Sequence, residues 1–265
     1  MSGFFAMSGS PFFAELSYDA GIDRLTCSDE GAQSCLMRVA ILLLAAGSGK
    51  RFGAEKPKQY LTVGGKALLL HTLDSLAQEP RICVVQPVIA GDDPYYEEAI
   101  KGHRFSFDLL APVVGGVERS ISMQRGLAAL PEDIDLVGVH DAARPLPSKA
   151  LLKDVLDVAE KHGAAVPAVT VHDTIKRVNA DGRVLETPDR TYLRAVQTPQ
   201  VAQRDWFVQA IEREKDHLHM HTDDASVLEA AGFPVYVSQG DLVNRKITTQ
   251  ADMDWLVSYL KERGK

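Results

Sequence analysis

The segment Val39-Ala-Ile-Leu-Leu-Leu-Ala-Ala-Gly-Ser-Gly-Lys-Arg-Phe-Gly53 decides the fold of this chain. Its first eight residues, Val39–Ala46, form an uninterrupted apolar run, which is typical of a strand buried on both faces. Glycines and cations follow at once. Because open α/β sheets bind ligands at the loops that follow their strands, the segment predicts a buried strand that leads into a ligand-binding loop.

The loop after this strand carries the residue types that bind a polyphosphate. Backbone N–H groups can approach an anion closely where side chains are small, as they are at Ala45, Ala46, Gly47 and Gly49. Four cations then follow within nine residues: Lys50, Arg51, Lys56 and Lys58. We therefore expect the loop to bind phosphate groups, and a solvated basic turn is the alternative.

The glycine spacing separates two further kinds of nucleotide site. The Walker A pattern is excluded because Phe52, not a glycine, stands five residues after Gly47. The glycines do resemble a dinucleotide fingerprint, which needs a helix directly after them and an acid about 20 residues further on. Pro57 interrupts such a helix, and Asp74 lies inside an amphipathic helix. An NAD-binding oxidoreductase is therefore the weaker alternative.

Short apolar runs alternate with amphipathic stretches along the rest of the chain. This alternation is typical of strands and crossover helices around a largely parallel sheet. The expected strands are Val39–Ala46, Ile82–Ile89, Phe107–Val113, Leu136–His140, Ala164–Thr170 and Pro234–Ser238, and the clearest helices are Ser148–Glu160 and Thr249–Lys261. The pattern predicts an α/β fold: a Rossmann-like three-layer sandwich with a mostly parallel central sheet.

A polar stretch at about residues 171–192 breaks this pattern. Residues 171–178 and 183–186 resemble two polar strands, joined by a turn that contains Asp181 and Gly182. Two strands this polar have little apolar surface to bury and would be marginally stable alone. We expect a protruding β-hairpin arm that finds support on another subunit, with a solvated surface hairpin as the alternative.

The overall charge disfavours several classes of partner. The 265 residues carry a net charge of -7, from 29 Lys and Arg against 36 Asp and Glu. Such an acidic balance argues against broad attraction to nucleic acid or to anionic membranes, so we expect neither partner. An anionic substrate must then be bound by a local basic pocket.

The cysteines and the apolar runs indicate where the protein resides. Cys27, Cys35 and Cys83 form no C-x-x-C pair, and their odd number argues against a disulfide scaffold. No apolar run approaches the roughly 20 residues that a membrane helix needs. We expect a protein of the reducing cytoplasm.

The first 36 residues differ from the rest, since phenylalanines lie among Ser, Gly and five acids with a single Arg. They lack the basic start and long apolar stretch of a signal peptide. We expect residues 1–36 to be a disordered extension or an upstream translation start, and residues 37–265 to form one domain. Because the chain ends just after its last expected helix, we expect no second catalytic domain.

Six short motifs in order resemble one enzyme family over about residues 38–262. They are residues 44–52 with Lys56-Pro-Lys-Gln-Tyr60, His140-Asp-Ala-Ala-Arg-Pro145, Asp173-Thr174, Thr198-Pro-Gln200, Thr222-Asp-Asp-Ala-Ser226 and Asn244-Arg-Lys-Ile-Thr248. Together they resemble nucleotidyltransferases with a glycosyltransferase-A-like fold, and among these the 2-C-methyl-D-erythritol 4-phosphate cytidylyltransferase family.

The resemblance implies a reaction. The family transfers CMP from CTP to 2-C-methyl-D-erythritol 4-phosphate, releasing diphosphate, as a magnesium-dependent homodimer whose arms are exchanged between subunits. The product, a CDP-alcohol, belongs to the non-mevalonate isoprenoid pathway. Two alternatives remain: a ribitol 5-phosphate (pentitol-phosphate) cytidylyltransferase, and a nucleotide-sensing module without turnover.

The resemblance also implies roles for individual residues. Arg51 and Lys58 match the cations on the triphosphate and transition state, while Arg190 and Lys246 match those that orient the acceptor phosphate. The implied CTP-binding residues are Ala45, Ala46, Gly47, Ser48, Gly49, Lys58, Gly115, Gly116, Arg119, Ser122, Asp141 and Ala142. The implied acceptor-binding residues are Asp141, Arg144, Thr174, Arg190, Thr198, Thr222, Asp223 and Lys246. The implied metal ligand is Asp141.

Structural alternatives exist for several of these residues. Arg144 can pair with Asp141, and Ser122 can cap the helix that it begins. Thr222 and Asp223 can cap the helix that follows them. Arg190 can form a surface ion pair with Asp189 or Glu186, which would contribute little to stability. We expect His140 to be a packed residue rather than a base, because a phosphate nucleophile is already ionised at neutral pH.

Overall fold

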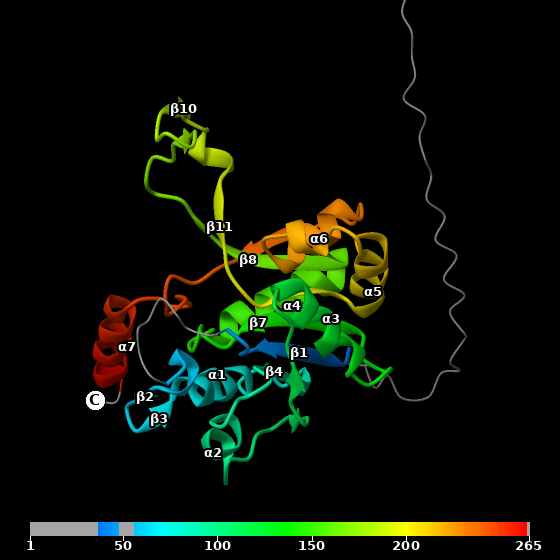
Figure 1. Cartoon of the computed structure of the whole chain (residues 1–265), viewed down its shortest axis with the longest axis vertical. Coiled ribbons are helices and arrows are strands. Elements are labelled where there is room, and N and C mark those ends of the chain that lie inside the picture. Colours follow the sequence, from blue (N-terminus) through cyan, green and yellow to red (C-terminus); the bar gives the residue numbers. More distant parts are fainter. Residues whose placement is uncertain (1–36, 48–55, 264–265) are drawn as a thin grey trace, which may run out of the picture. The chain divides into compact units, whose positions relative to one another are not determined.

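The computed structural model describes residues 37–47 and 56–263. Its centre is a nine-stranded sheet in the order β11-β8-β12-β7-β1-β4-β5, with β13 paired to β8 and β6 paired to β4. The strands are β1 (Val39–Leu44), β4 (Ile82–Ile89), β5 (Asp108–Leu109), β6 (Val113–Val114), β7 (Leu136–Asp141), β8 (Ala164–Thr170), β11 (Arg194–Val196), β12 (Gln200–Gln203) and β13 (Tyr236–Gln239). The apolar strand β1 lies between β7 and β4 (Figure 1).

The register of β1 against β7 positions the site. These strands run parallel, and Leu44 at the end of β1 lies opposite Asp141 at the end of β7. Parallel strands present their carboxyl ends at the same edge of a sheet, so the loop after β1 and the Asp141 carboxylate meet there. β12 runs antiparallel to both β7 and β8, which makes the sheet mixed.

Helices cover both faces of the sheet, because the side chains of each buried strand alternate between two cores. On one face, Ile41 and Leu43 pack with α1 (Leu68–Leu76) and α4 (Lys149–His162). On the other face, Ala40 and Leu42 pack with α3 (Arg119–Ala128), α5 (Arg204–Arg213) and α6 (Asp224–Ala230). The result is the three-layer α/β sandwich that the sequence predicts.

A third apolar cluster anchors the C-terminal part of the described chain. Met253 and Leu256 of α7 (Gln250–Arg263) pack with Val63, Leu68 and Ile247. Ile247 lies one residue after Lys246, so this packing fixes the segment that carries Lys246. The remaining elements outside the arm are η2 (Lys58–Tyr60), β2 (Thr62–Val63), β3 (Lys66–Ala67), α2 (Tyr96–Ile100) and η4 (Leu218–Met220).

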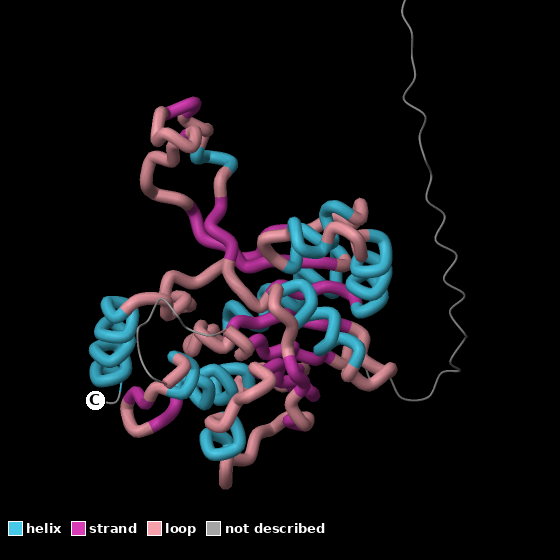
Figure 2. The backbone as a smooth tube through the Cα atoms, in the orientation of Figure 1, coloured by secondary structure: helices cyan, strands magenta, loops and turns pink. Residues whose placement is uncertain are grey.

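The segment between β8 and β11 extends away from the sheet (Figure 1). It holds a separate two-stranded sheet of β9 (Arg177–Val178) and β10 (Val184–Glu186), followed by η3 (Arg190–Tyr192). Most of it is loop (Figure 2). Most of its large apolar side chains are exposed, from 39% at Ile175 to 83% at Tyr192. We call residues 171–193 the arm; the paired strands β8 and β11 form its base.

The structure differs from the sequence expectations in a few places. The expected strand 107–113 is two short strands, β5 and β6, which pair with different parts of β4. β11 and β12 were not expected, and the arm strands are shorter than the residues assigned to them. The expected extension, residues 1–36, lies outside the described residues. Within the described ranges, no helix is both long enough and apolar enough to span a membrane.

Candidate active site

A pocket of about 370 Å³ lies at the carboxyl ends of β1 and β7. Its size is within the usual range for small-molecule sites, about 300–1,000 Å³. Residues from five segments line it: 44–47, 58–59, 116–122, 141–143 and 246–248. Segments far apart in the chain therefore meet where the register of β1 and β7 brings them together.

The described residues of the predicted phosphate loop lie before residue 48 and after residue 55. Ala45, Ala46 and Gly47 line the pocket, as does Lys58. The Gln59 amide donates to the carbonyl of Ala45 at 2.7 Å, which ties η2 to the end of β1. Lys58 Nζ donates to the carbonyl of Ile247 at 2.8 Å. The predicted residues Ser48, Gly49 and Arg51, and also Lys50, lie outside the described residues.

Lys56 is placed differently from Lys58. Its Nζ lies 5.0 Å from the centre of the Tyr95 ring, a cation–π arrangement, and Lys56 does not line the pocket. Tyr95 follows Asp93, whose carboxylate accepts from the Tyr60 hydroxyl at 2.5 Å. In this structure Lys56 therefore anchors the loop to the chain near α2.

The second glycine loop needs its glycines for packing. A Cβ on Gly115 would lie 2.7 Å from the Ala46 Cβ, and one on Gly116 would lie 2.3 Å from the Ile121 side chain. The Ser122 hydroxyl accepts from the Gly116 N–H at 3.0 Å and donates to the Glu118 carbonyl at 3.1 Å. Ser122 thus fixes the shape of this pocket wall, but it lies inside α3 and does not cap it, since Glu118 is the N-cap residue.

Asp141 is surrounded by cations. Its Oδ1 accepts from Arg119, its Oδ2 lies 2.8 Å from Lys246 Nζ, and Arg144 Nε lies 3.8 Å from the same oxygen. Burial alone raises the pKa of this carboxyl, but Arg119 and Lys246 outweigh burial and hold the pKa well below its usual range. Asp141 is therefore ionised at neutral pH.

Arg119 bridges two carboxylates. Besides Asp141, it binds Oδ2 of Asp224 through Nε at 3.1 Å and Nη2 at 2.6 Å. Asp224 is 1% exposed, and its Oδ1 has no hydrogen-bond partner among the described residues. Burial raises the pKa of Asp224, while Arg119 opposes that rise. The sequence did not predict a role for Asp224; its position in the acidic pair Asp223-Asp224 was the signal available.

The pocket has a positive excess. Among its lining residues, Lys58, Arg119 and Lys246 stand against Glu118 and Asp141. A basic pocket in an acidic chain was the expectation from composition. It suits an anionic ligand such as a polyphosphate, because the field of several cations in a concave site concentrates anions there.

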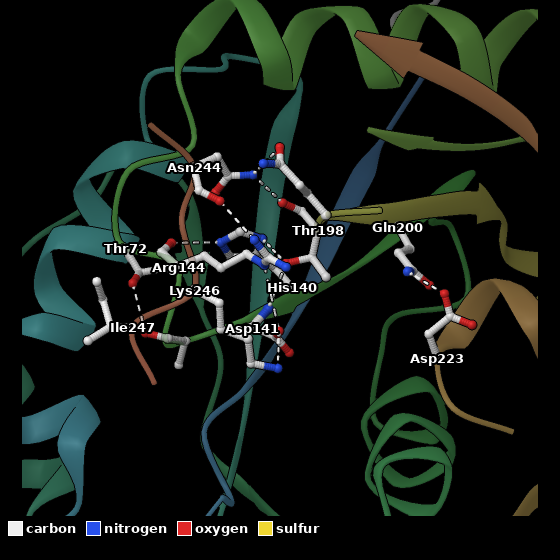
Figure 3. Close-up of polar contacts among 12 residues, drawn as sticks. Thr72, His140, Asp141, Arg144, Thr198, Gln200, Asp223, Asn244, Lys246 and Ile247 are labelled. Carbon is white, nitrogen blue, oxygen red and sulfur yellow. Dashed lines mark hydrogen bonds and ion pairs between the residues drawn. The ribbon is translucent and has the colours of Figure 1, made fainter. Parts of the chain in front are cut away.

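Three predicted acceptor residues lie just behind the pocket wall or beside it. The Arg144 guanidinium donates to the Asn244 carbonyl at 2.8 Å, and the Thr198 hydroxyl lies 3.0 Å from His140 Nδ1 (Figure 3). Asp223 caps α6, since its Oδ1 accepts from the Ser226 N–H at 3.1 Å. The Gln200 amide donates to the other Asp223 oxygen at 2.8 Å. The capping alternative is therefore realised for Asp223.

The predicted arm residues are not part of the pocket. Thr174 and Arg190 are exposed, and neither lines it. Arg190 Nη1 donates to the His172 carbonyl at 2.5 Å, within the arm. The Arg190 ion pair with Asp189 or Glu186 is not formed; Glu186 pairs with Arg177 and Asp189 caps η3. Thr222 is likewise exposed. The described chain therefore brings most of the described residues predicted to bind CTP to the pocket but leaves Thr174, Arg190 and Thr222 outside it.

His140 and Asn244 are buried polar residues that the sequence did not identify as functional. Both have 0% exposed surface. Burial lowers the pKa of His140 to about 4, although the neighbouring Asp141 opposes this shift. The expectation that His140 is packed rather than a base agrees with this neutral, enclosed ring. Only long-range contacts reveal their roles, and the sequence contains no local signal for those.

Asp141 is the residue suited to a metal. Among residues 37–47 and 56–263, no group of three or more His, Cys, Asp or Glu is arranged to hold a metal ion. Mg²⁺ does not need such a group when phosphates supply the other ligands, since one or two carboxylates then suffice. A carboxylate has about four lone-pair sites, so the cation contacts of Asp141 leave room for a metal.

This geometry defines a class of protein. A mostly parallel sheet whose carboxyl edge carries small residues, a basic pocket and a buried carboxylate is typical of α/β proteins that bind phosphorylated nucleotides. Comparisons with known proteins give the particular family. Residues 39–262 match the family described as "IspD: 2-C-methyl-D-erythritol 4-phosphate cytidylyltransferase". The chain belongs to this family.

Individual relatives agree. The chain is 41% identical over 228 residues to the 2-C-methyl-D-erythritol 4-phosphate cytidylyltransferase of Desulforamulus reducens, covering 85% of this chain and 97% of that protein. It is 42% identical over 218 residues to the bifunctional enzyme IspD/IspF of a Bradyrhizobium species, covering 81% of this chain. The chain spans about half, 54%, of that relative's length.

A solved structure shows the same fold. The 4-diphosphocytidyl-2C-methyl-D-erythritol synthase of Anaerococcus prevotii superposes with a TM-score of 0.74 at 29% identity, covering 85% of this chain and 99% of that one. The family match confirms the resemblance seen in the sequence motifs and favours a nucleotidyltransferase over the NAD-binding alternative.

Proposed function

We propose that this chain transfers CMP from CTP to 2-C-methyl-D-erythritol 4-phosphate, releasing diphosphate and forming a CDP-alcohol of isoprenoid synthesis. One observation supports this above the others: the loop after β1, Lys58, Asp141 and Lys246 converge on one basic pocket. Membership of the cytidylyltransferase family supports cytidylyl transfer as the reaction of this pocket. The reaction would take place in the cytoplasm.

The proposed mechanism consists of positioning and charge neutralisation. In phosphoryl transfer the protein aligns the nucleophile with the leaving group and neutralises charge, because two anions must approach each other. Lys58, together with Arg51, binds the triphosphate and stabilises the charge that develops on it. Lys246 and Arg190 bind the acceptor phosphate and direct one of its oxygens at the α-phosphorus. No general base is needed because this phosphate is already ionised.

Magnesium belongs to this proposal. Asp141 would hold the ion together with phosphate oxygens of CTP, and the bound ion would neutralise part of the triphosphate charge. Asp141 would share its oxygens with Arg119 and Lys246. These two cations keep the carboxylate ionised and oriented toward the pocket.

The arm supports a homodimer with shared active sites. Its apolar side chains are exposed, and its Thr174 and Arg190 do not reach the pocket of their own chain. In a dimer with exchanged arms, each arm would bury its apolar residues on the partner. It would also bring Arg190 and Thr174 to the partner's acceptor site. The arrangement accounts for both properties of the arm at once.

A nucleotide and acceptor screen tests the proposed function. Diphosphate release is measured with CTP, ATP, GTP or UTP and with each alcohol phosphate in turn, with and without Mg²⁺ or a chelator. We expect turnover only with CTP, a divalent cation and the methylerythritol phosphate. Turnover with ribitol 5-phosphate instead would overturn the acceptor assignment, and NAD binding without diphosphate release would overturn the reaction class.

A further inference from the structure

A closed ring of hydrogen bonds lies directly behind Asp141 and Lys246 (Figure 3). Asn244 Nδ2 donates to the Thr198 carbonyl at 2.9 Å, and Thr198 Oγ1 lies 3.0 Å from His140 Nδ1. His140 Nε2 lies 3.1 Å from the Arg144 carbonyl, and Arg144 Nη1 donates to the Asn244 carbonyl at 2.8 Å. The ring therefore links three segments that are distant in sequence.

The directions of these bonds follow from the groups involved. The Arg144 carbonyl can only accept, so His140 Nε2 carries the hydrogen and Nδ1 is the acceptor. Thr198 must then donate its one hydroxyl hydrogen to Nδ1. The same hydroxyl oxygen accepts from the Asp141 N–H at 3.2 Å. Thr198 thus has no hydrogen left to donate to a substrate.

Burial makes each hydrogen bond of the ring costly to break. His140 and Asn244 are fully buried and Thr198 is 4% exposed. Water cannot replace a lost partner easily in such a place, so breaking one bond leaves a buried polar group unsatisfied. The Gln197 side chain holds the segments of Thr198 and Asn244 together from outside the ring. Its amide nitrogen donates to the Asp241 carbonyl at 2.8 Å, and its oxygen accepts from the Asp241 N–H at 3.1 Å.

The ring borders the pocket on two sides. Asp141 follows His140 directly, and Lys246 follows Asn244 by two residues. The two charged side chains meet at 2.8 Å in front of the ring. A shift of either segment would change this separation.

We propose that His140, Thr198 and Asn244 are positioning residues, whose ring with Arg144 sets the placement of Lys246 relative to Asp141. The inference rests on the proposed function for what that placement achieves: the alignment of the acceptor phosphate with the nucleotide. Thr198 acts through His140 and the Asp141 backbone rather than by touching the acceptor. The nucleotide loops around residues 45–47 and 115–116 have no bond in the ring, so the ring acts on CTP only through Asp141.

A matched pair of variants tests the proposal. Thr198→Val keeps the side-chain shape but removes the hydroxyl, whereas Thr198→Ser keeps the hydroxyl. We expect Thr198→Val to lower kcat/KM for the acceptor by about 10–100-fold, the usual loss when a supporting residue is removed. CTP affinity, measured by calorimetry without acceptor, falls less than kcat/KM does, because the loops around residues 45–47 and 115–116 lie outside the ring. Thr198→Ser restores most of the activity, and a thermal melt shows that both variants are folded.

A double-variant cycle separates positioning from direct contact. If Thr198 acts through His140, adding Thr198→Val to His140→Phe costs little beyond His140→Phe alone. If Thr198 touches the acceptor, the two losses multiply, and the proposal is overturned. Equal activity of Thr198→Val and the wild type would also overturn it, as would equal losses in Thr198→Val and Thr198→Ser.

A spectroscopic readout needs no turnover. Nitrogen-15 NMR of the wild type should show His140 as a neutral ring with hydrogen on Nε2, and Thr198→Val should shift the Nδ1 resonance. Hydrogen on Nδ1 in the wild type would contradict the ring whatever the activity. Failure of the proposed function is distinguishable, because it would show as no diphosphate release by the wild type while the NMR signature persists.

Discussion

Two regions supply the predicted site, and they are built in opposite ways. At the end of β7, Asp141 is 6% exposed and contacts cations from α3 and from the segment before α7. In the arm, Arg190 and Thr174 are exposed, and the apolar side chains around them have no cover. The first region is complete within one chain. The second region exposes apolar side chains beside charged ones, as the surface of a subunit interface does.

The ion pairs of the two regions differ in the same way. In the arm, Arg177 and Glu186 are 2.7 Å apart with about half of each side chain exposed, 59% and 52%. Such exposed pairs contribute about 0–1 kcal/mol, so they do not hold the arm in place. The pairs of Asp141 are shielded, and breaking one leaves a buried charge. Under the proposed function, nucleotide binding would be preorganised within one chain and acceptor binding would depend on dimerisation.

The largest effect is expected at the preorganised region. Lys58→Ala should lower kcat by about 10²–10³-fold, as loss of one preorganised charge-stabilising donor does. Diphosphate release measures the rate, and a thermal melt checks the fold. Lys215→Ala is the matched control, since Lys215 forms only an exposed pair with Glu212. Near-normal turnover of Lys58→Ala would refute the transition-state role.

A smaller and more selective effect is expected in the arm. Arg190→Ala should reduce kcat/KM for the acceptor by about 10–100-fold, corresponding to charge-assisted hydrogen bonds of about 1.5–3 kcal/mol. CTP affinity should not change. Arg177→Ala, in the same arm, serves as the control and should retain activity. An equal loss of CTP affinity in Arg190→Ala would contradict the assignment of Arg190 to acceptor binding alone.

Removal of the N-cap of α6 should have a modest effect on the stability of the protein. Asp223→Ala removes the N-cap and the contact with Gln200, and should lower the free energy of unfolding by about 1 kcal/mol. Asp223→Asn, which can still cap, should lose much less. Chemical denaturation measures both. If Asp223→Asn instead impairs acceptor use without loss of stability, Asp223 binds substrate as well as capping the helix.

The smallest effect is expected at Asp252, at the start of α7. Burial raises the pKa of this carboxyl, but hydrogen bonds from the N–H groups of Thr248 and Thr249 outweigh that and lower the pKa from 3.8 to about 2. A lowered pKa contributes stability above the unfolded value, which is lost as pH falls toward the folded value.

Asp252→Asn isolates this contribution. The stability difference between wild type and variant should be constant above about pH 5 and should shrink between 3.8 and about 2. The change arises from the pKa shift of Asp252, because asparagine does not titrate. Denaturant titrations across this pH range measure it. A difference that grows on acidification would contradict the assigned direction of the pKa.

The sequence predicts most of the sheet but less of the site, for physical reasons. β4 and β8 match their expected ranges, because strands buried on both faces are continuous apolar runs. β12 begins and ends with glutamine, and its strand state comes from pairing with β7 and β8. No local pattern records that pairing.

The same distinction separates the site residues. Lys58 and Asp141 could be predicted because they are charged residues in motifs after the apolar strand β1 and at the end of β7. Asp224 could not, since its partner Arg119 is 105 residues away in the chain. Thr198 and His140 are 58 residues apart, and no local pattern in either segment predicts the hydrogen bond between them. Buried polar networks are tertiary features, so only a structure reveals them.

Subunit mixing tests most directly whether the arm completes the partner's site. Lys58→Ala and Arg190→Ala dimers are mixed and allowed to exchange subunits, and differently tagged chains report the fraction of mixed dimers. One mixed-dimer site then combines an intact pocket with an intact arm. Random exchange should therefore restore about a quarter of wild-type activity. Verified mixed dimers with no more activity than the parent variants would show that each chain completes its own site.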